Sequence, residues 1–267
     1  MIPDLYDRKL GFGELLAASW RVFKGNIKFL LLFCIAANGL LAIAEWMVSF
    51  SLPDSLDYRL VESWSQLVGG LFDYIPALGA IVITARYLEA RPISSSDVFN
   101  ELRRMLGAGL HVNLYLSIVG LAHLFLIYST SKSIFGLVAP FIQTFSLILF
   151  AIVSIYISFA LQALVLRNRR GRGTLIYSWR TVKGQWGTVF GKMFLLGIVV
   201  GLPLVVILVF GMRFSIVFSS VMKQICTLIF PVFSTIFLTV LFLNIDREGL
   251  KEKVEELTHP ANPVNPV

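Results

Sequence analysis

The stretch Ile134–Leu166, IFGLVAPFIQTFSLILFAIVSIYISFALQALVL, contains 33 residues and not one charged side chain. A helix that crosses the apolar interior of a bilayer needs about 20 residues at about 1.5 Å each. The run is therefore too long for one upright helix and too short for two helices joined by a turn. We expect Pro140 to let the first turn or two lie at the membrane interface while the remainder tilts across.

Five other apolar stretches of spanning length accompany this run. The six predicted spans are Ile27–Phe50, Leu67–Leu88, Leu110–Tyr128, Ile134–Leu166, Trp186–Met212 and Met222–Asn244. Only 15% of the 267 residues are charged, whereas a soluble domain averages about 25%. The sequence predicts an all-α, polytopic membrane bundle over residues 1–245. A cytoplasmic charged helix and a disordered, proline-rich tail are expected over residues 246–267.

The distribution of Lys and Arg orients the predicted bundle, because basic residues are retained on the cytoplasmic side of a membrane. With the N-terminus inside, 19 of the 23 Lys and Arg residues fall in cytoplasmic segments. The four outer bases are Arg59, Lys132, Arg213 and Lys223. The split predicts a multi-pass protein of a bacterial inner membrane with both termini in the cytoplasm. The net charge of +7 is then assigned to contact with lipid headgroups and not to nucleic acid.

A short motif occurs twice in the chain. Ser19–Gly25, SWRVFKG, returns as Ser178–Gly184, SWRTVKG, with five of the seven residues identical. A weaker relative, Ser96–Arg104, leads into the third span. Each copy precedes an outward-going span, which predicts three transmembrane hairpins, each preceded by an amphipathic cytoplasmic helix at the interface. These interfacial helices are expected near residues 12–25, 95–106 and 173–184.

Tryptophan and basic residues on these helices suit the headgroup region of a bilayer. The predicted membrane-surface and lipid-binding residues are Trp20, Arg21, Lys24, Arg103, Arg104, Trp179, Arg180 and Lys183. We call their six bases the basic collar. The collar is expected to hold anionic lipid, and a protein partner or a second copy of the chain is also open. The plainer alternative is that these bases only set the topology.

Two segments carry a resemblance to a known group. Leu10–Lys24, LGFGELLAASWRVFK, and Leu175–Gly191, LIYSWRTVKGQWGTVFG, resemble the signatures of a broad bacterial group of six-span proteins. The group includes the YciC-like inner-membrane proteins and the membrane domain fused to some glycerophosphodiester phosphodiesterases. The resemblance implies the six-span fold and supplies no catalytic residue. The chain departs from the group at Leu166–Gly171, LRNRRG, which is basic where the group often has an acidic turn.

Three ionisable side chains fall in the outer half of the predicted bundle: Glu45, Asp73 and His123. A carboxylate at membrane depth is costly and is therefore a candidate functional group. The three residues could line an outward-facing cavity that binds a cation or a proton. Alternatively, they reach the outer interface or pair with Arg213 or Lys223.

Four glycines lie on one face of the fifth span: Gly187, Gly191, Gly197 and Gly201. Small residues at such spacing let another helix approach closely in a membrane. We therefore expect this face to pack against a second helix, either within the chain or in another subunit.

The sequence contains no motif of a familiar catalytic or metal centre. It has no His-Glu-x-x-His, Walker, Gly-x-Ser-x-Gly or Cys-x-x-Cys pattern, and its three histidines are scattered. No cofactor or metal is expected. The first hypothesis is a non-enzymatic membrane protein that organises lipids or partner proteins through the basic collar. The alternatives are a transporter or channel subunit that uses the Asp73 region, and a lipid-processing enzyme.

Overall fold

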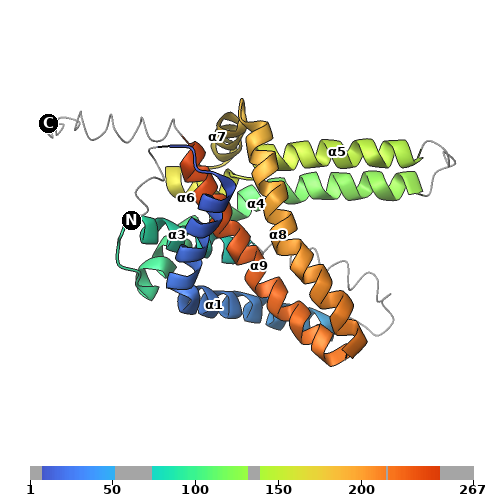
Figure 1. Cartoon of the computed structure of the whole chain (residues 1–267), viewed down its shortest axis with the longest axis horizontal. Coiled ribbons are helices and arrows are strands. Elements are labelled where there is room, and N and C mark those ends of the chain that lie inside the picture. The colour runs from blue at the N-terminus through green and yellow to red at the C-terminus, as the bar shows by residue number, and fades with distance from the viewer. Residues whose placement is uncertain (1–7, 52–73, 132–138, 215, 247–267) are drawn as a thin grey trace, which may run out of the picture.

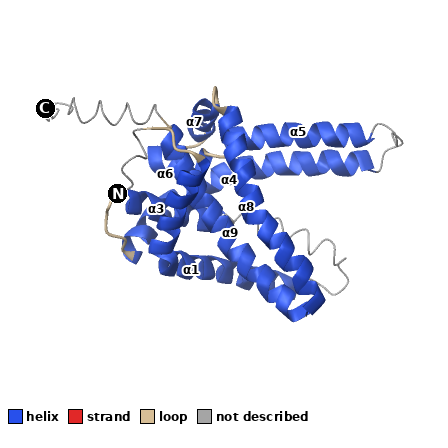
Figure 2. Cartoon of the chain, viewed as in Figure 1, coloured by secondary structure: helices blue, strands red, loops and turns tan. Residues whose placement is uncertain are grey.

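The described part of the chain is built from α-helices alone. The computed structural model describes residues 8–51, 74–131, 139–214 and 216–246, and within these ranges Figure 2 shows helices joined by short loops. The helices are α1 (Phe12–Ser51), α3 (Tyr74–Leu88), α4 (Ser95–Ser131), α5 (Ala139–Ile157), α6 (Ala160–Arg167), α7 (Arg172–Val182), α8 (Trp186–Phe214) and α9 (Ile216–Ile245). The all-α prediction is confirmed, and each apolar stretch overlaps at least one helix.

Helix α9 is at the centre of the packed part of the molecule. It lies against α1, α3 and α8, and Figure 1 shows it crossing the molecule between α1 and α8. Phe237, Val240, Leu241 and Phe242 in its second half are completely buried. Contacts among side chains of this size, individually weak, add up to the main attraction that holds these helices together.

Helices α5 and α8 expose large apolar side chains. Figure 1 shows α4 and α5 side by side, running in opposite directions and projecting from the packed part. Two helical stretches among the described residues are long and apolar enough to cross a membrane: Pro140–Arg167, which runs from α5 through α6, and Trp186–Pro203 within α8. Only 11% of the residues in Trp186–Pro203 are buried. The core helix of a water-soluble protein would bury such residues, so both helices present an unusually apolar exterior.

A cap at the start of α1 is supplied by its own sequence. The Gly11 amide donates to the Glu14 carboxylate (2.8 Å), as in a capping box, and Arg8 pairs with the same carboxylate. The Arg8 guanidinium, and after it the Gly11 amide, holds the pKa of Glu14 below its usual range. This carboxylate therefore stabilises the fold above about pH 4.5, and its contribution is lost as the pH falls through the lowered pKa.

Helix α1 is continuous from Phe12 to Ser51, so the interfacial helix expected near residues 12–25 is its first part. Gly25, where that helix was expected to end, remains helical. A side chain there would stand 3.0 Å from the ring of Tyr87 in α3, and the neighbouring Asn26 amide donates to the Val22 carbonyl (2.9 Å). The helix thus runs through Gly25 despite the low helix propensity of glycine, at the point where Tyr87 of α3 lies against it. Figure 1 shows α1 changing direction within its length.

Helix α4 is also continuous, so the interfacial helix expected over residues 95–106 is its first part. Arg86 near the end of α3 reaches across to it. The Arg86 guanidinium donates to Glu101 (3.0 Å) and to Asp97 (3.2 Å). These two ion pairs tie the end of α3 to the beginning of α4.

The long uncharged run is divided into α5 and α6, which corrects the expectation of a single tilted helix. The Phe159 amide donates to the Ser178 hydroxyl (3.1 Å). That hydroxyl in turn donates to the Tyr156 carbonyl (2.7 Å). A side chain that enters the backbone ladder of a helix is a recognised cause of a sharp kink. The run itself could not reveal this break, because the inserted serine lies 19 positions after Phe159.

Helix α7, Arg172–Val182, corresponds to the interfacial helix expected over residues 173–184. It ends just before Gly184, whose φ is +85°. Glycine adopts this left-handed conformation without the clash that a Cβ would cause. The repeated motif therefore ends a helix in its second copy, whereas the helix runs on through the first copy.

Both ends of the described chain meet beside α8. The side-chain amide of Asn244 donates to the Arg8 carbonyl (2.8 Å) and accepts a hydrogen bond from the Leu10 amide (3.0 Å). The Lys192 ammonium donates to the Leu10 carbonyl (2.9 Å). We call these contacts the terminal latch. It fixes the segment before α1 against α8 and the end of α9.

Candidate functional site

The two copies of the repeated motif present their side chains in the same way. Ser19 and Ser178 are completely buried, whereas Trp20 and Trp179 are 55% and 47% exposed. In both copies the serine hydroxyl donates to a backbone carbonyl (2.7 Å). The arginine that follows each tryptophan is exposed. Each copy is thus anchored by its serine and turns its tryptophan and arginine outward.

Each exposed tryptophan also rests on aromatic side chains. Trp20 stacks on Phe23 with ring centroids 5.7 Å apart and meets the ring of Phe233 in α9 edge-on. Trp179 stacks on Tyr156 at 3.9 Å. Such contacts fix the indole orientation while part of the ring remains available to the surroundings.

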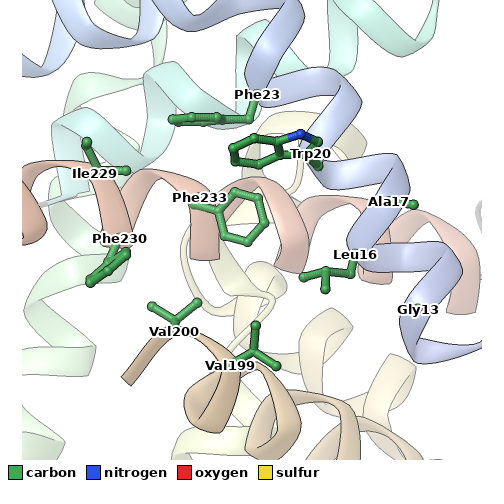
Figure 3. A pocket seen from close by; sticks show the side chains of 10 residues that line it. All are labelled: Gly13, Leu16, Ala17, Trp20, Phe23, Val199, Val200, Ile229, Phe230 and Phe233. Carbon is green, nitrogen blue, oxygen red and sulfur yellow. The ribbon is translucent and has the colours of Figure 1, made fainter. Parts of the chain in front are cut away.

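An apolar groove lies beside the first copy, between α1, α8 and α9, and we call it the Trp20 groove. Its volume is about 450 Å³, within the range of about 300–1,000 Å³ typical of ligand pockets. In Figure 3 the rings of Trp20, Phe23 and Phe233 form one wall, and Val199 and Val200 of α8 face them. The remaining lining residues are Gly13, Leu16, Ala17, Ile229 and Phe230.

The six bases of the collar are all exposed, and none forms an ion pair with another described residue. They are Arg21, Lys24, Arg103, Arg104, Arg180 and Lys183. They belong to the first part of α1, the first part of α4, and α7 with the residue after it. Figure 1 shows these segments on the side away from the projecting ends of α4 and α5. Positive charge that is not engaged in an ion pair attracts anions to that side.

The expected glycine face of α8 does not pack against another described helix. A Cβ atom built at any of the four positions would meet no atom within 4 Å. The positions are Gly187, Gly191, Gly197 and Gly201. Of the two expected alternatives, packing within the described part of the chain is not seen at these glycines, and packing against another subunit stays a prediction.

Close approach occurs instead at a glycine of α4. A Cβ atom at Gly109 would stand 2.8 Å from Leu78 and from the ring of Tyr74, both in α3. The Tyr74 hydroxyl donates to the Leu106 carbonyl (3.1 Å), which holds its ring in place. Gly109 is therefore where α3 and α4 need the absence of a side chain.

The three ionisable residues of the predicted outer cluster are not brought together by the described part of the structure. Asp73 lies outside the described residues. Glu45 lies in α1 and His123 in α4, but neither side chain is among those described. The proposed cavity around Asp73 stays a prediction.

The main polar cluster in the structure lies at the end of α9. Asp246 is 3% exposed, and its carboxylate accepts hydrogen bonds from Arg167 (2.7 Å) and from the Tyr177 hydroxyl (2.7 Å). Arg169 lies over the same tyrosine ring, 5.7 Å from its centroid. The sequence analysis did not single out this acid, and its one signal was an aspartate directly after a long apolar run.

Comparison of the chain with protein-family models, with curated proteins and with solved structures finds no match in any of the three.

Proposed function

We propose that this chain is a non-enzymatic, multi-pass protein of a bacterial inner membrane that organises anionic lipid through the basic collar and the Trp20 groove. The supporting observation is the position of Trp20, which lines an apolar groove while the next residue, Arg21, is an exposed base. A phospholipid has the matching parts, an apolar chain beside an anionic phosphate. Tryptophan is the side chain most typical of the depth at which these parts meet.

The exterior of the molecule supports a lipid environment. Phe141 and Phe145 of α5 are 77% and 69% exposed, and Phe194 and Leu202 of α8 are 58% and 63% exposed. Lipid tails solvate such side chains without the free-energy cost that water imposes. In this proposal the six apolar stretches cross the membrane as three hairpins, both termini are cytoplasmic, and the collar meets the anionic inner leaflet.

Replacing collar bases tests the electrostatic half of the proposal. The variant Arg21→Gln, Lys24→Gln, Arg180→Gln and Lys183→Gln should retain at most about half as much phosphatidylglycerol as the parent after purification. The reason is that each base near an anionic leaflet contributes about 1 kcal/mol. Native mass spectrometry counts the retained lipid. The control replaces Arg59, Lys132, Arg213 and Lys223 with Gln, which removes the same charge from the predicted outer side. If both variants retain the same amount of phosphatidylglycerol, the collar bases only set the membrane topology and do not bind lipid.

Filling the groove tests the apolar half. Ala17→Leu places three more carbon atoms among the lining residues and should lower the amount of retained lipid. Ala36→Leu is the matched control, because Ala36 lies in the same helix, is exposed and does not line the groove. If the two variants retain the same lipid, an acyl chain does not occupy the groove. Collar-dependent capture of an acidic protein, with unchanged lipid, would instead favour a protein partner.

A further inference from the structure

A second cavity lies between α4 and the basic turn that follows α6. Its volume is about 290 Å³, the share of roughly ten water molecules in the liquid. Its lining residues are Glu101, Arg104, Met105 and Ala108 of α4, Leu164 of α6, and Asn168 and Arg170 of the turn. It is separate from the Trp20 groove, with which it shares no lining residue.

The charges around this cavity do not cancel. Arg104 and Arg170 form no hydrogen bond or ion pair with any side chain that the structure describes. Glu101, the acid among the lining residues, already accepts a hydrogen bond from Arg86 (3.0 Å). Two unpaired guanidinium groups thus line one hollow, and its single carboxylate is paired elsewhere.

The backbone fixes the turn that brings Arg170 to the cavity. Asn168 has a φ of +48° and Gly171 a φ of +56°, conformations that Asn and Gly adopt most readily. The next guanidinium back along the chain, Arg169, lies over the Tyr177 ring, and Arg167 is paired with Asp246. Those two arginines have structural partners, which leaves Arg170 for a ligand.

We propose that this cavity binds a phosphate-bearing anion between Arg104 and Arg170. Guanidinium groups bind phosphate oxygens through two parallel N–H donors, and the Asn168 amide in the lining adds a further donor. Met105, Ala108 and Leu164 give the cavity an apolar side that suits the organic part of a phosphate ester. The shared chemistry is the phosphate group, whether it belongs to a lipid headgroup or to a free phosphate.

The test uses the full chain with two double variants. Arg104→Gln with Arg170→Gln removes both cavity bases. Lys28→Gln with Arg172→Gln is the matched control, since these two exposed bases lie outside the basic collar and do not line the cavity. In the detergent-purified protein, calorimetry measures the affinity for inorganic phosphate. In nanodiscs of phosphatidylcholine with phosphatidylglycerol, native mass spectrometry measures retained phosphatidylglycerol.

The cavity variant should bind at least about tenfold more weakly than the control in one of the two assays, because charge-assisted hydrogen bonds are the strong ones. A loss confined to inorganic phosphate identifies a free phosphate, and a loss confined to lipid identifies a headgroup. Equal behaviour of the two double variants in both assays overturns the proposal. Should the cavity variant melt early, Arg170→Gln is compared with Arg172→Gln in its place. The collar variant retains both cavity arginines, so failure of the proposed function and failure of this site are distinguishable.

Discussion

The stability of the fold depends strongly on Asp246, because its ion pair with Arg167 is buried. The side chain of Asp246 is 1% exposed and that of Arg167 is 15% exposed. Asp246→Ala would leave the guanidinium buried without its carboxylate, which typically costs about 3–5 kcal/mol. We expect a correspondingly large loss in the free energy of unfolding, measured by denaturant titration in detergent.

The matched control for Asp246→Ala is Arg91→Ala, which breaks the exposed pair with Glu89. Exposed ion pairs contribute about 0–1 kcal/mol. A cost for Asp246→Ala no greater than that for Arg91→Ala would contradict the structural role of the buried pair.

The repeated motif showed how far single residues can be predicted from sequence. Its tryptophans and arginines were expected at the membrane surface; all four are exposed, and their contact with lipid stays a prediction. The partners of Asp246 and Asn244 could not be predicted, because a polar residue at the end of an apolar run has no periodic signal. Arg167 lies 79 positions before Asp246, and Leu10 lies 234 positions before Asn244. Only the folded chain brings such pairs together.

At the scale of helices, the contact between α3 and α4 depends on Gly109. Gly109→Ala should lower stability by about 1–3 kcal/mol, because the added methyl group would overlap Leu78 and Tyr74. Gly107→Ala in the same helix meets nothing within 4 Å and should be neutral or stabilising, since alanine favours a helix by up to about 1 kcal/mol. Thermal unfolding in detergent compares the two. If both variants melt alike, the close approach of α3 and α4 is not as described.

Helices were easier to predict than their boundaries. Long apolar runs identify helices by composition alone, and each of the six runs overlaps a helix. The boundaries depended on contacts from elsewhere in the chain. Tyr87 packs against Gly25 where a break was expected, and Ser178 breaks the uncharged run where none was expected. The same motif thus ends a helix once and continues one once.

At the scale of the whole molecule, the proposed topology places both chain ends in the cytoplasm. A reporter that is active only outside the cytoplasm, fused after Val267, should be silent. The reason is that 19 of the 23 Lys and Arg residues would otherwise have to lie on the outer side. The same reporter fused after Leu56, in the first predicted outer loop, should be active and serves as the control. Activity after Val267 would overturn the arrangement with six spans.

The terminal latch has a consequence for the order in which the chain is made. Leu10 leaves the ribosome well before its described partners, Lys192 and Asn244, which lie 182 and 234 positions later in the chain. A ribosome that adds about 5–20 residues per second needs on the order of 10–50 s to go from Leu10 to Asn244. Until then the amide and carbonyl of Leu10 must hydrogen-bond to water. Helix α1 also lacks the face of α9 on which it packs. Closure of the latch is therefore a late event in biogenesis, and only a chain translated through α9 can complete it.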